Sequence, residues 1–138
     1  MKSMHVTFGA AVMLLAVPMA FAADEISVMS VPGATTVDSA KAKSLFDKKV
    51  AFIDTRNDKD WDAGRIPGAA HLDIKTAFTE ESLAKVIKKD GEVVMYCNGE
   101  KCLRSSQAAE KAVKWGYTKV YYYRDGFPAW QGAAYPVE

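Results

Sequence analysis

The sequence contains few of the residue types on which many enzymes depend. It has two histidines and two cysteines in 138 residues, and its formal net charge is +1. His5 lies near the N-terminus, so His71 is the one histidine left for a site in the rest of the chain. This shortage argues against Ser-His-Asp triads and multi-histidine metal sites, and we expect neither a metal ion nor a cofactor. Near-neutrality argues against a nucleic-acid partner bound through bulk charge.

Long hydrophobic runs are also missing. The apolar stretch 8–17 is too short for a transmembrane helix, which needs about 20 such residues, and Pro18 follows it. Lys2 precedes the stretch, and Ala20-Phe21-Ala22 fits the small-x-small cleavage rule. We therefore predict a signal peptide at 1–22 and prefer it to a membrane anchor. The protein is then periplasmic or secreted, formally neutral, and free of the membrane after cleavage.

The rest of the chain predicts one α/β domain. Residues 23–34 show no periodicity, and we assign them to an irregular segment before a domain at 35–138. Apolar runs without alternation suit strands buried on both faces of a parallel sheet. Strands are expected at 35–37, 50–54, about 70–74, 92–97 and 120–123, with helices at about 39–49, 80–89 and 105–115. Asp38 or Ser39 and Thr79 are the predicted N-caps of the first two helices. The fold class is thus a mostly parallel five-stranded sheet flanked by helices.

Both cysteines lie in one loop between a predicted strand and a predicted helix. Cys97 ends the apolar run Val93–Tyr96, and Cys102 follows five residues later. Sites in parallel sheets lie beyond the carboxyl ends of the strands, where Asp54 also falls. Backbone amides and the positive end of a helix converge at such a place, and they favour a thiolate and a bound anion. We expect a sulfur-handling site here.

Several motifs, in this order, resemble the rhodanese-like sulfurtransferases. They are Phe52-Ile53-Asp54-Thr55-Arg56, Gly64-Arg65-Ile66-Pro67-Gly68-Ala69, Tyr96-Cys97 to Arg104-Ser105, Gly116-Tyr117 and Gly126 to Trp130. The resemblance implies a single rhodanese fold and a cysteine that carries sulfane sulfur as a persulfide. It also implies a loop whose backbone amides surround the substrate. This sequence departs from the family's pattern in two ways. Arg65 stands where the family commonly has histidine. The spacing from Cys97 to Arg104 is C-x6-R, which is longer than the usual C-x4-R of sulfurtransferases or C-x5-R of phosphatase-like members. The second cysteine makes this a C-x4-C loop, which resembles that of a subgroup of small exported rhodanese-like proteins.

Cys97 is the predicted nucleophile. Its thiolate would attack the outer sulfur of thiosulfate or a persulfide and pass that sulfur to a thiol or cyanide, as in covalent catalysis with two displacements. Arg104 and the substrate-binding loop would neutralise the developing charge. That loop comprises Asn98, Gly99, Glu100, Lys101, Cys102 and Leu103, and Gly99 is expected to permit an unusual backbone angle.

The residues expected to support the site can also be explained by purely structural roles. Asp54 and Arg56 match the acid and arginine that the family carries after this strand, and they either shape the floor of the site or form a buried ion pair. We favour the ion pair. Ser105 is expected to cap the helix that follows the loop, and His71 to be a strand residue with a local hydrogen bond.

Cys102 leaves three possibilities open. It forms a permanent disulfide with Cys97, as an even cysteine count in an exported protein suggests. Alternatively, it forms a reversible bridge by attacking a Cys97 persulfide or sulfenic acid, or it stays reduced. The predicted function is sulfurtransferase, with a redox or sulfur-binding module or a phosphatase- or arsenate-reductase-like enzyme as alternatives. We expect a small sulfur-containing substrate, a periplasmic thiol or redox protein as partner, and a monomer.

Overall fold

The computed structural model describes residues 25–138, so the predicted signal peptide lies outside the described residues. Five strands form one sheet in the order β1-β5-β4-β2-β3. They are β1 (Ala34–Thr36), β2 (Ala51–Asp54), β3 (Ala70–His71), β4 (Glu92–Tyr96) and β5 (Lys119–Tyr123). Every neighbouring pair is parallel, which confirms the predicted fold class.

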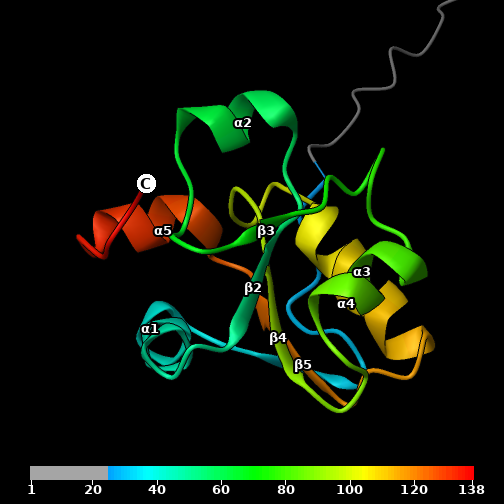
Figure 1. Ribbon diagram of the computed structural model, residues 1–138. Helices are drawn as coiled ribbons and strands as arrows, with labels where there is room; N and C mark the ends of the chain where they lie inside the picture. The colour runs from blue at the N-terminus through cyan, green and yellow to red at the C-terminus, as the bar shows by residue number, and fades with distance from the viewer. Residues whose placement is uncertain (1–24) are drawn as a thin grey trace, which may run out of the picture.

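In the part of the chain that the structure describes, five helices flank the sheet. They are α1 (Ser39–Asp47), α2 (Asp58–Ala63), α3 (Glu80–Val86), α4 (Arg104–Lys114) and α5 (Gly126–Gly132). In Figure 1, α1 and α5 lie on one face of the sheet, α3 and α4 lie on the other, and α2 stands above the end of β2. Within residues 25–138, no helix combines the length and the apolarity needed to cross a bilayer.

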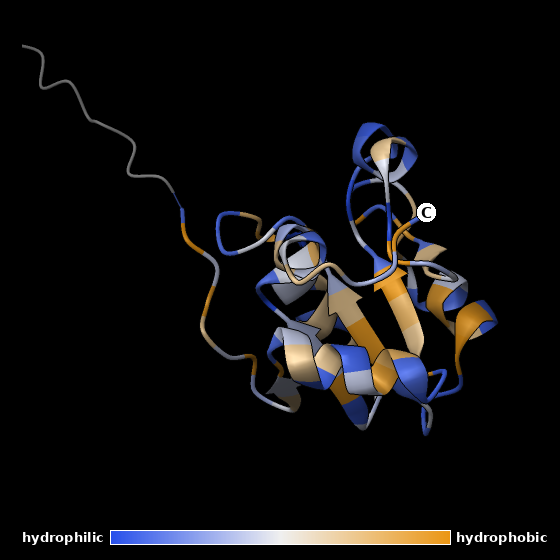
Figure 2. Ribbon diagram, turned by 90° about the vertical axis from the view of Figure 1, so that its left-hand side faces the viewer, coloured by the Kyte–Doolittle hydropathy of each residue, from blue (hydrophilic) through white to orange (hydrophobic). Residues whose placement is uncertain are grey.

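The central strands are buried on both faces because their successive side chains point into two different cores. Val93 and Met95 of β4 pack with α3 and α4, whereas Val94 and Tyr96 pack with α1 and α5. Figure 2 shows the hydrophobic strands in the centre and the hydrophilic segments outside them. This two-sided burial explains why the sequence of β4 is a continuous apolar run rather than an alternating one.

Local capping signals in the sequence fix two helix starts. The Asp38 side chain accepts a hydrogen bond from the Lys41 amide and begins α1. Thr79 and Ser82 form a reciprocal capping box at the start of α3. Both N-caps were predicted, although α3 ends at Val86 and is shorter than expected.

Two helices were not predicted from the sequence. Helix α2 is a polar six-residue segment with no buried residue, so it has no apolar periodicity to reveal it. Asn57 caps it by accepting from the Asp60 amide. Helix α5 contains Gly126, Pro128 and Gly132, which are unfavourable inside helices, and tertiary packing of Phe127 and Trp130 overrides that propensity.

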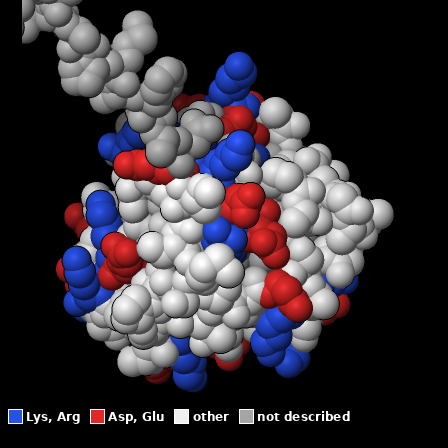
Figure 3. Space-filling model, turned by 180° about the vertical axis from the view of Figure 1, so that it is seen from behind, with Lys and Arg blue, Asp and Glu red and all other residues white. Residues whose placement is uncertain are grey.

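Charges are mixed over the surface. On the face shown in Figure 3, Lys and Arg alternate with Asp and Glu, and neither sign dominates it. This distribution agrees with the near-zero net charge of the sequence.

Candidate active site

The loop from Cys97 to Leu103 connects the carboxyl end of β4 to the first turn of α4. Both of its cysteines are free thiols in this structure. Three backbone hydrogen bonds shape the loop: the Cys102 amide donates to the Gly99 carbonyl (3.0 Å), the Phe127 amide to the Cys97 carbonyl (2.8 Å), and the Ser27 amide to the Glu100 carbonyl (2.7 Å). The loop is therefore held by its own turn, by α5 and by the N-terminal segment.

Two glycines are required by the path of this loop. Gly99 has a φ of 104°, which confirms the predicted need for glycine there. Gly126 has a φ of 66°, and a Cβ at that position would run into the Cys97 carbonyl and lie 2.8 Å from the Gly99 amide nitrogen. The start of α5 thus approaches the cysteine loop more closely than any residue with a side chain would permit.

Cys97 is completely buried beneath the loop. Its sulfur lies 3.2 Å from the Ser105 hydroxyl oxygen and 3.4 Å from the Cys102 carbonyl oxygen, to which the thiol can donate. Burial and the neighbouring Cys102 sulfur raise the pKa of Cys97 well above the ordinary range of a thiol. Burial thus opposes the expected effect of this position, which was to lower the pKa of the Cys97 thiol.

The features expected around Cys97 converge instead on Cys102. A hydrogen bond from Cys97 lowers the pKa of Cys102 to about 6, helped by the amides of Asn98 and Arg104 and the Arg104 charge, against some desolvation. Cys102 is partly exposed and lines an open cavity of about 490 Å³. Lys75, Lys101 and Arg104 line the same cavity, together with Asp60. The more acidic thiol is the one that faces solvent and cations.

Arg104 is the first residue of α4, which begins one residue before the predicted start. Its guanidinium donates to the Asp73 carboxylate (2.7 Å) and to the Thr55 carbonyl (3.4 Å). The Asp73 side chain is mostly buried and fixes the orientation of this arginine. Sequence reasoning missed Asp73, and its position just after the short β3 strand was the only signal that pointed to it.

Asp54 and Arg56 form a buried ion pair behind the loop, as we favoured. Their side chains are joined at 2.7 Å and are almost fully buried. The Tyr96 hydroxyl also donates to Asp54 (2.8 Å), and Arg56 donates to the Asn98 side-chain oxygen (3.2 Å). Arg56 also lies over the Phe127 ring, with the guanidinium carbon 4.5 Å from its centroid. The pair thus supports the loop through Asn98 and does not touch either sulfur.

Of three further residues considered in the sequence, Ser105 and Glu100 differ from expectation and His71 agrees with it. Ser105 does not cap α4: the helix begins one residue earlier, with Leu103 at the N-cap and no side-chain cap, and the Ser105 hydroxyl contacts Cys97. Glu100 is directed to the far side of the loop, where it pairs with Arg124 (3.6 Å). His71 is a strand residue that hydrogen-bonds the Arg56 carbonyl (2.8 Å), as predicted, and it stacks on Trp61.

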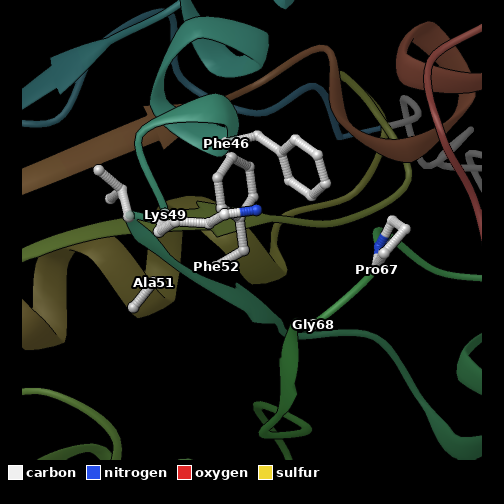
Figure 4. A pocket seen from close by; sticks show the side chains of 7 residues that line it. Phe46, Lys49, Ala51, Phe52, Pro67 and Gly68 are labelled. Carbon is white, nitrogen blue, oxygen red and sulfur yellow. The ribbon is translucent and has the colours of Figure 1, made fainter.

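A second hollow, of about 380 Å³, lies near the amino ends of β2 and β3, away from the cysteines. Figure 4 shows Phe46 and Phe52 on its wall, with the Lys49 side chain extending across it and Pro67 opposite. It holds no thiol and none of the predicted site residues. The chemistry of the described residues therefore belongs to the cavity beside Cys102. No group of three or more His, Cys, Asp or Glu side chains within residues 25–138 is placed to hold a metal ion.

The sequence profile described as the rhodanese-like domain matches residues 36–133. The chain belongs to the rhodanese-like family. The BH2092 protein of Bacillus halodurans shares this fold with a TM-score of 0.67 at 22% identity, over 76% of this chain and 77% of that one. The human single domain sulfurtransferase TSTD1 is 25% identical, with a TM-score of 0.60, over 72% of this chain and 96% of that one. These likenesses confirm the rhodanese-like fold.

Among curated proteins, the tRNA uridine(34) hydroxylase of Buchnera aphidicola is 36% identical over 91 residues. The match covers 59% of this chain and 27% of that protein. This rhodanese-like chain thus spans about a quarter of the length of the hydroxylases that it matches. Their whole-protein activity belongs to a larger molecule, and the likeness supports a shared domain.

Proposed function

We propose that this protein is a sulfurtransferase, which takes sulfane sulfur from thiosulfate or a persulfide donor, carries it as a Cys97 persulfide and passes it to a thiol or cyanide. Membership of the rhodanese-like family supports this class of chemistry. The likeness to the human single domain sulfurtransferase, which the match covers almost completely, points the same way.

The observation that carries the proposal is a pair of free thiols in one loop, of which Cys102 lines a cavity with three cationic side chains. A sulfane-sulfur donor such as thiosulfate is a small anion, and Arg104 with Lys75 and Lys101 would attract it. Ping-pong sulfur transfer needs a nucleophilic sulfur and an anion site, and it requires no metal and no histidine base when a thiolate is already present. Export to the periplasm or beyond, a thiol or redox partner there and a monomeric state belong to the same proposal.

The test follows the sulfur through both halves of the reaction. Reduced protein is treated anaerobically with thiosulfate or with glutathione persulfide, and intact mass spectrometry measures the addition of one sulfur atom. We expect a persulfide on wild-type protein that is discharged by cyanide or a thiol. The double variant Cys97→Ser/Cys102→Ser, with circular dichroism as a check of folding, should take up none. Wild-type protein that takes up no sulfur from either donor would contradict the proposal.

A redox module is the second candidate function, because both free thiols lie in one short loop and the Cys97 thiol can donate to the Cys102 carbonyl (3.4 Å). Such a module would cycle between dithiol and disulfide and would carry no sulfane sulfur. A mass lower by two hydrogens after mild oxidation, reversed by a dithiol and unaccompanied by any sulfur uptake, would favour this function. Hydrolysis of an aryl phosphate that is lost in the double variant would favour a phosphatase-like enzyme instead.

A further inference from the structure

The two sulfurs of the loop occupy opposite environments. Cys97 lies beneath the loop with no exposed surface, enclosed by the Ser105 hydroxyl and the Cys102 carbonyl. Cys102 lies on the wall of the open cavity, next to Arg104 and Lys101. A small anion that enters the cavity therefore meets Cys102 before it reaches Cys97.

The loop backbone supports the same assignment. The amides of Asn98 and Arg104 and the Arg104 charge all lower the pKa of the Cys102 thiol, and Arg104 lines the same cavity as Cys102. Amides and a cation around one sulfur stabilise negative charge there, both on a thiolate and on a persulfide. Cys97 has the Ser105 amide, the Ser105 hydroxyl and the Cys102 carbonyl as polar neighbours, with no cation among them, and it is completely buried.

We propose that Cys102 is the thiol that captures sulfur from the donor and that it relays this sulfur to Cys97, where the persulfide is stored. This inference rests on the proposed sulfur-transfer function and assigns the two cysteines to different steps of it. It gives the second cysteine of the C-x4-C loop a role in catalysis.

The capture step is a displacement at sulfur. The Cys102 thiolate attacks the outer sulfur of thiosulfate, the sulfur–sulfur bond of thiosulfate breaks, and sulfite leaves with the bonding electron pair. Cys102 then carries a persulfide anion. With an organic persulfide donor the attack is the same and the leaving group is a thiolate. Arg104 and the loop amides are placed to stabilise the negative charge on Cys102 before and after capture.

The relay step is a second displacement inside the loop. The Cys97 proton moves to the outer sulfur of the Cys102 persulfide, and the resulting Cys97 thiolate attacks that sulfur. The bond between the outer sulfur and Cys102 breaks, so Cys102 leaves as a thiolate and Cys97 becomes the persulfide. No external oxidant or reductant is consumed, because one sulfur–sulfur bond forms as another breaks.

The order of acidity of the two thiols favours transfer in this direction. The pKa of Cys102 is lowered to about 6, whereas burial raises that of Cys97. In thiol–disulfide exchange the more acidic thiol is the better leaving group, and the less acidic thiolate is the stronger nucleophile. Burial then protects the stored sulfur, because competing thiols in solution cannot reach Cys97 without opening of the loop.

The experiment locates the sulfur on each cysteine as a function of time. Trypsin cleaves after Lys101, so Cys97 and Cys102 leave on separate peptides. Reduced protein is mixed with thiosulfate, quenched at intervals by denaturation in excess iodoacetamide, digested and analysed by mass spectrometry. In wild-type protein, sulfur should label the Cys102 peptide first and then accumulate on the Cys97 peptide.

Two serine variants separate capture from storage. Cys102→Ser should slow the labelling of Cys97 at least about tenfold, because the thiolate in the cavity is lost. Cys97→Ser should still take up sulfur, on Cys102, and should lose it faster to added glutathione. Cys102→Ala should slow the labelling of Cys97 as Cys102→Ser does, and circular dichroism verifies that every variant is folded.

Three results would overturn the relay. Labelling of Cys97 at the wild-type rate in Cys102→Ser would show direct capture by Cys97. Sulfur that remains on Cys102 in wild-type protein would remove the storage role of Cys97. Release of sulfide with formation of a Cys97–Cys102 disulfide would make Cys102 a resolving thiol instead. In the first two cases wild-type protein retains the sulfur, and in the third the sulfur that it took up is recovered as sulfide, so failure of the relay is distinguished from failure of the proposed function.

Discussion

The Arg104 guanidinium is held 2.7 Å from the Asp73 carboxylate, although 31 positions separate the two residues in the chain. Asp73 follows β3 at the edge of the sheet, and Arg104 opens α4 beside β4. The pair fixes the arginine against the wall of the cavity that contains Cys102. Its carboxylate also offsets part of the positive charge that acts on the sulfur.

Removal of the positive charge and removal of the negative charge of this pair should shift the pKa of Cys102 in opposite directions. Arg104→Gln removes the cation beside the thiolate and should raise the pKa of Cys102. Asp73→Asn removes the negative charge that offsets the arginine, so it should lower that pKa further. The pH dependence of iodoacetamide alkylation, resolved by tryptic mapping, measures both. Shifts of the same sign in the two variants would contradict this electrostatic account.

In wild-type protein, Cys102 should be the thiol that alkylates first. Its rate should increase with pH around a midpoint of about 6 and level off above it, because the thiolate is the reactive form. Cys97 should remain largely unmodified over the same range because burial raises its pKa and denies access to the reagent. Cys97→Ala removes the hydrogen bond that contributes most to the acidity of Cys102, and the midpoint should move upward. An unchanged midpoint in Cys97→Ala would exclude that hydrogen bond as the main cause.

The sequence contained enough information for the sheet and for the position of the cysteine loop. Uninterrupted apolar runs such as Val93–Tyr96 predict strands buried on both faces, and capping residues such as Asp38 signal helix starts through purely local contacts. The same local logic fails for α5, where the packing of Trp130 outweighs unfavourable helix propensities.

The division of labour between the cysteines could not be predicted in this way. Which sulfur is buried depends on how the loop folds, and the loop is in contact with Ser27, Phe127 and Gly126, which are far away in the chain. A strand–loop–helix pattern predicts that amides and a helix terminus converge on the loop. It does not specify which of two thiols they meet. Long-range packing therefore sets the detail on which the chemistry depends.

Breaking the buried Asp54–Arg56 pair should destabilise the fold strongly, because it leaves one charge buried without a partner. Asp54→Asn leaves the Arg56 guanidinium buried without a counter-ion, which should lower the free energy of unfolding by about 3 kcal/mol. Asp47→Asn is the matched control, because it breaks an exposed pair with Lys43 that is worth no more than about 0.5 kcal/mol. Urea unfolding followed by circular dichroism measures both. Equal effects of the two substitutions would argue against a structural role for the buried pair.

Gly126 should be intolerant of even the smallest side chain. Gly126→Ala places a methyl group against the Cys97 carbonyl in a backbone conformation that favours glycine, so the loop must shift. We expect lower stability, by about 1–3 kcal/mol, together with slower sulfur uptake. Gly132→Ala lies in the same helix with open space around the new methyl group, and it should leave both properties nearly unchanged. Wild-type uptake in Gly126→Ala would show that the loop tolerates displacement.

The N-terminal segment should help to hold the cysteine loop closed. The Ser27 amide donates to the Glu100 carbonyl (2.7 Å), and the Tyr122 hydroxyl and the Arg124 guanidinium hold the neighbouring carbonyls of Val28 and Ser27. Ser27→Pro removes the amide hydrogen and therefore the direct link to the loop.

With this link removed, the loop should open more often. Amide hydrogen exchange in residues 98–103 should then be faster, and Cys97 should react with iodoacetamide more quickly than in wild-type protein. Ser27→Ala keeps the amide and loses only the hydroxyl, so it controls for disturbance of this buried position. Since burial protects Cys97, a stored persulfide should also be lost to glutathione sooner in Ser27→Pro than in Ser27→Ala. Identical amide hydrogen exchange and identical Cys97 reactivity in the two variants would mean that α5 and the internal turn hold the loop closed without the Ser27 amide.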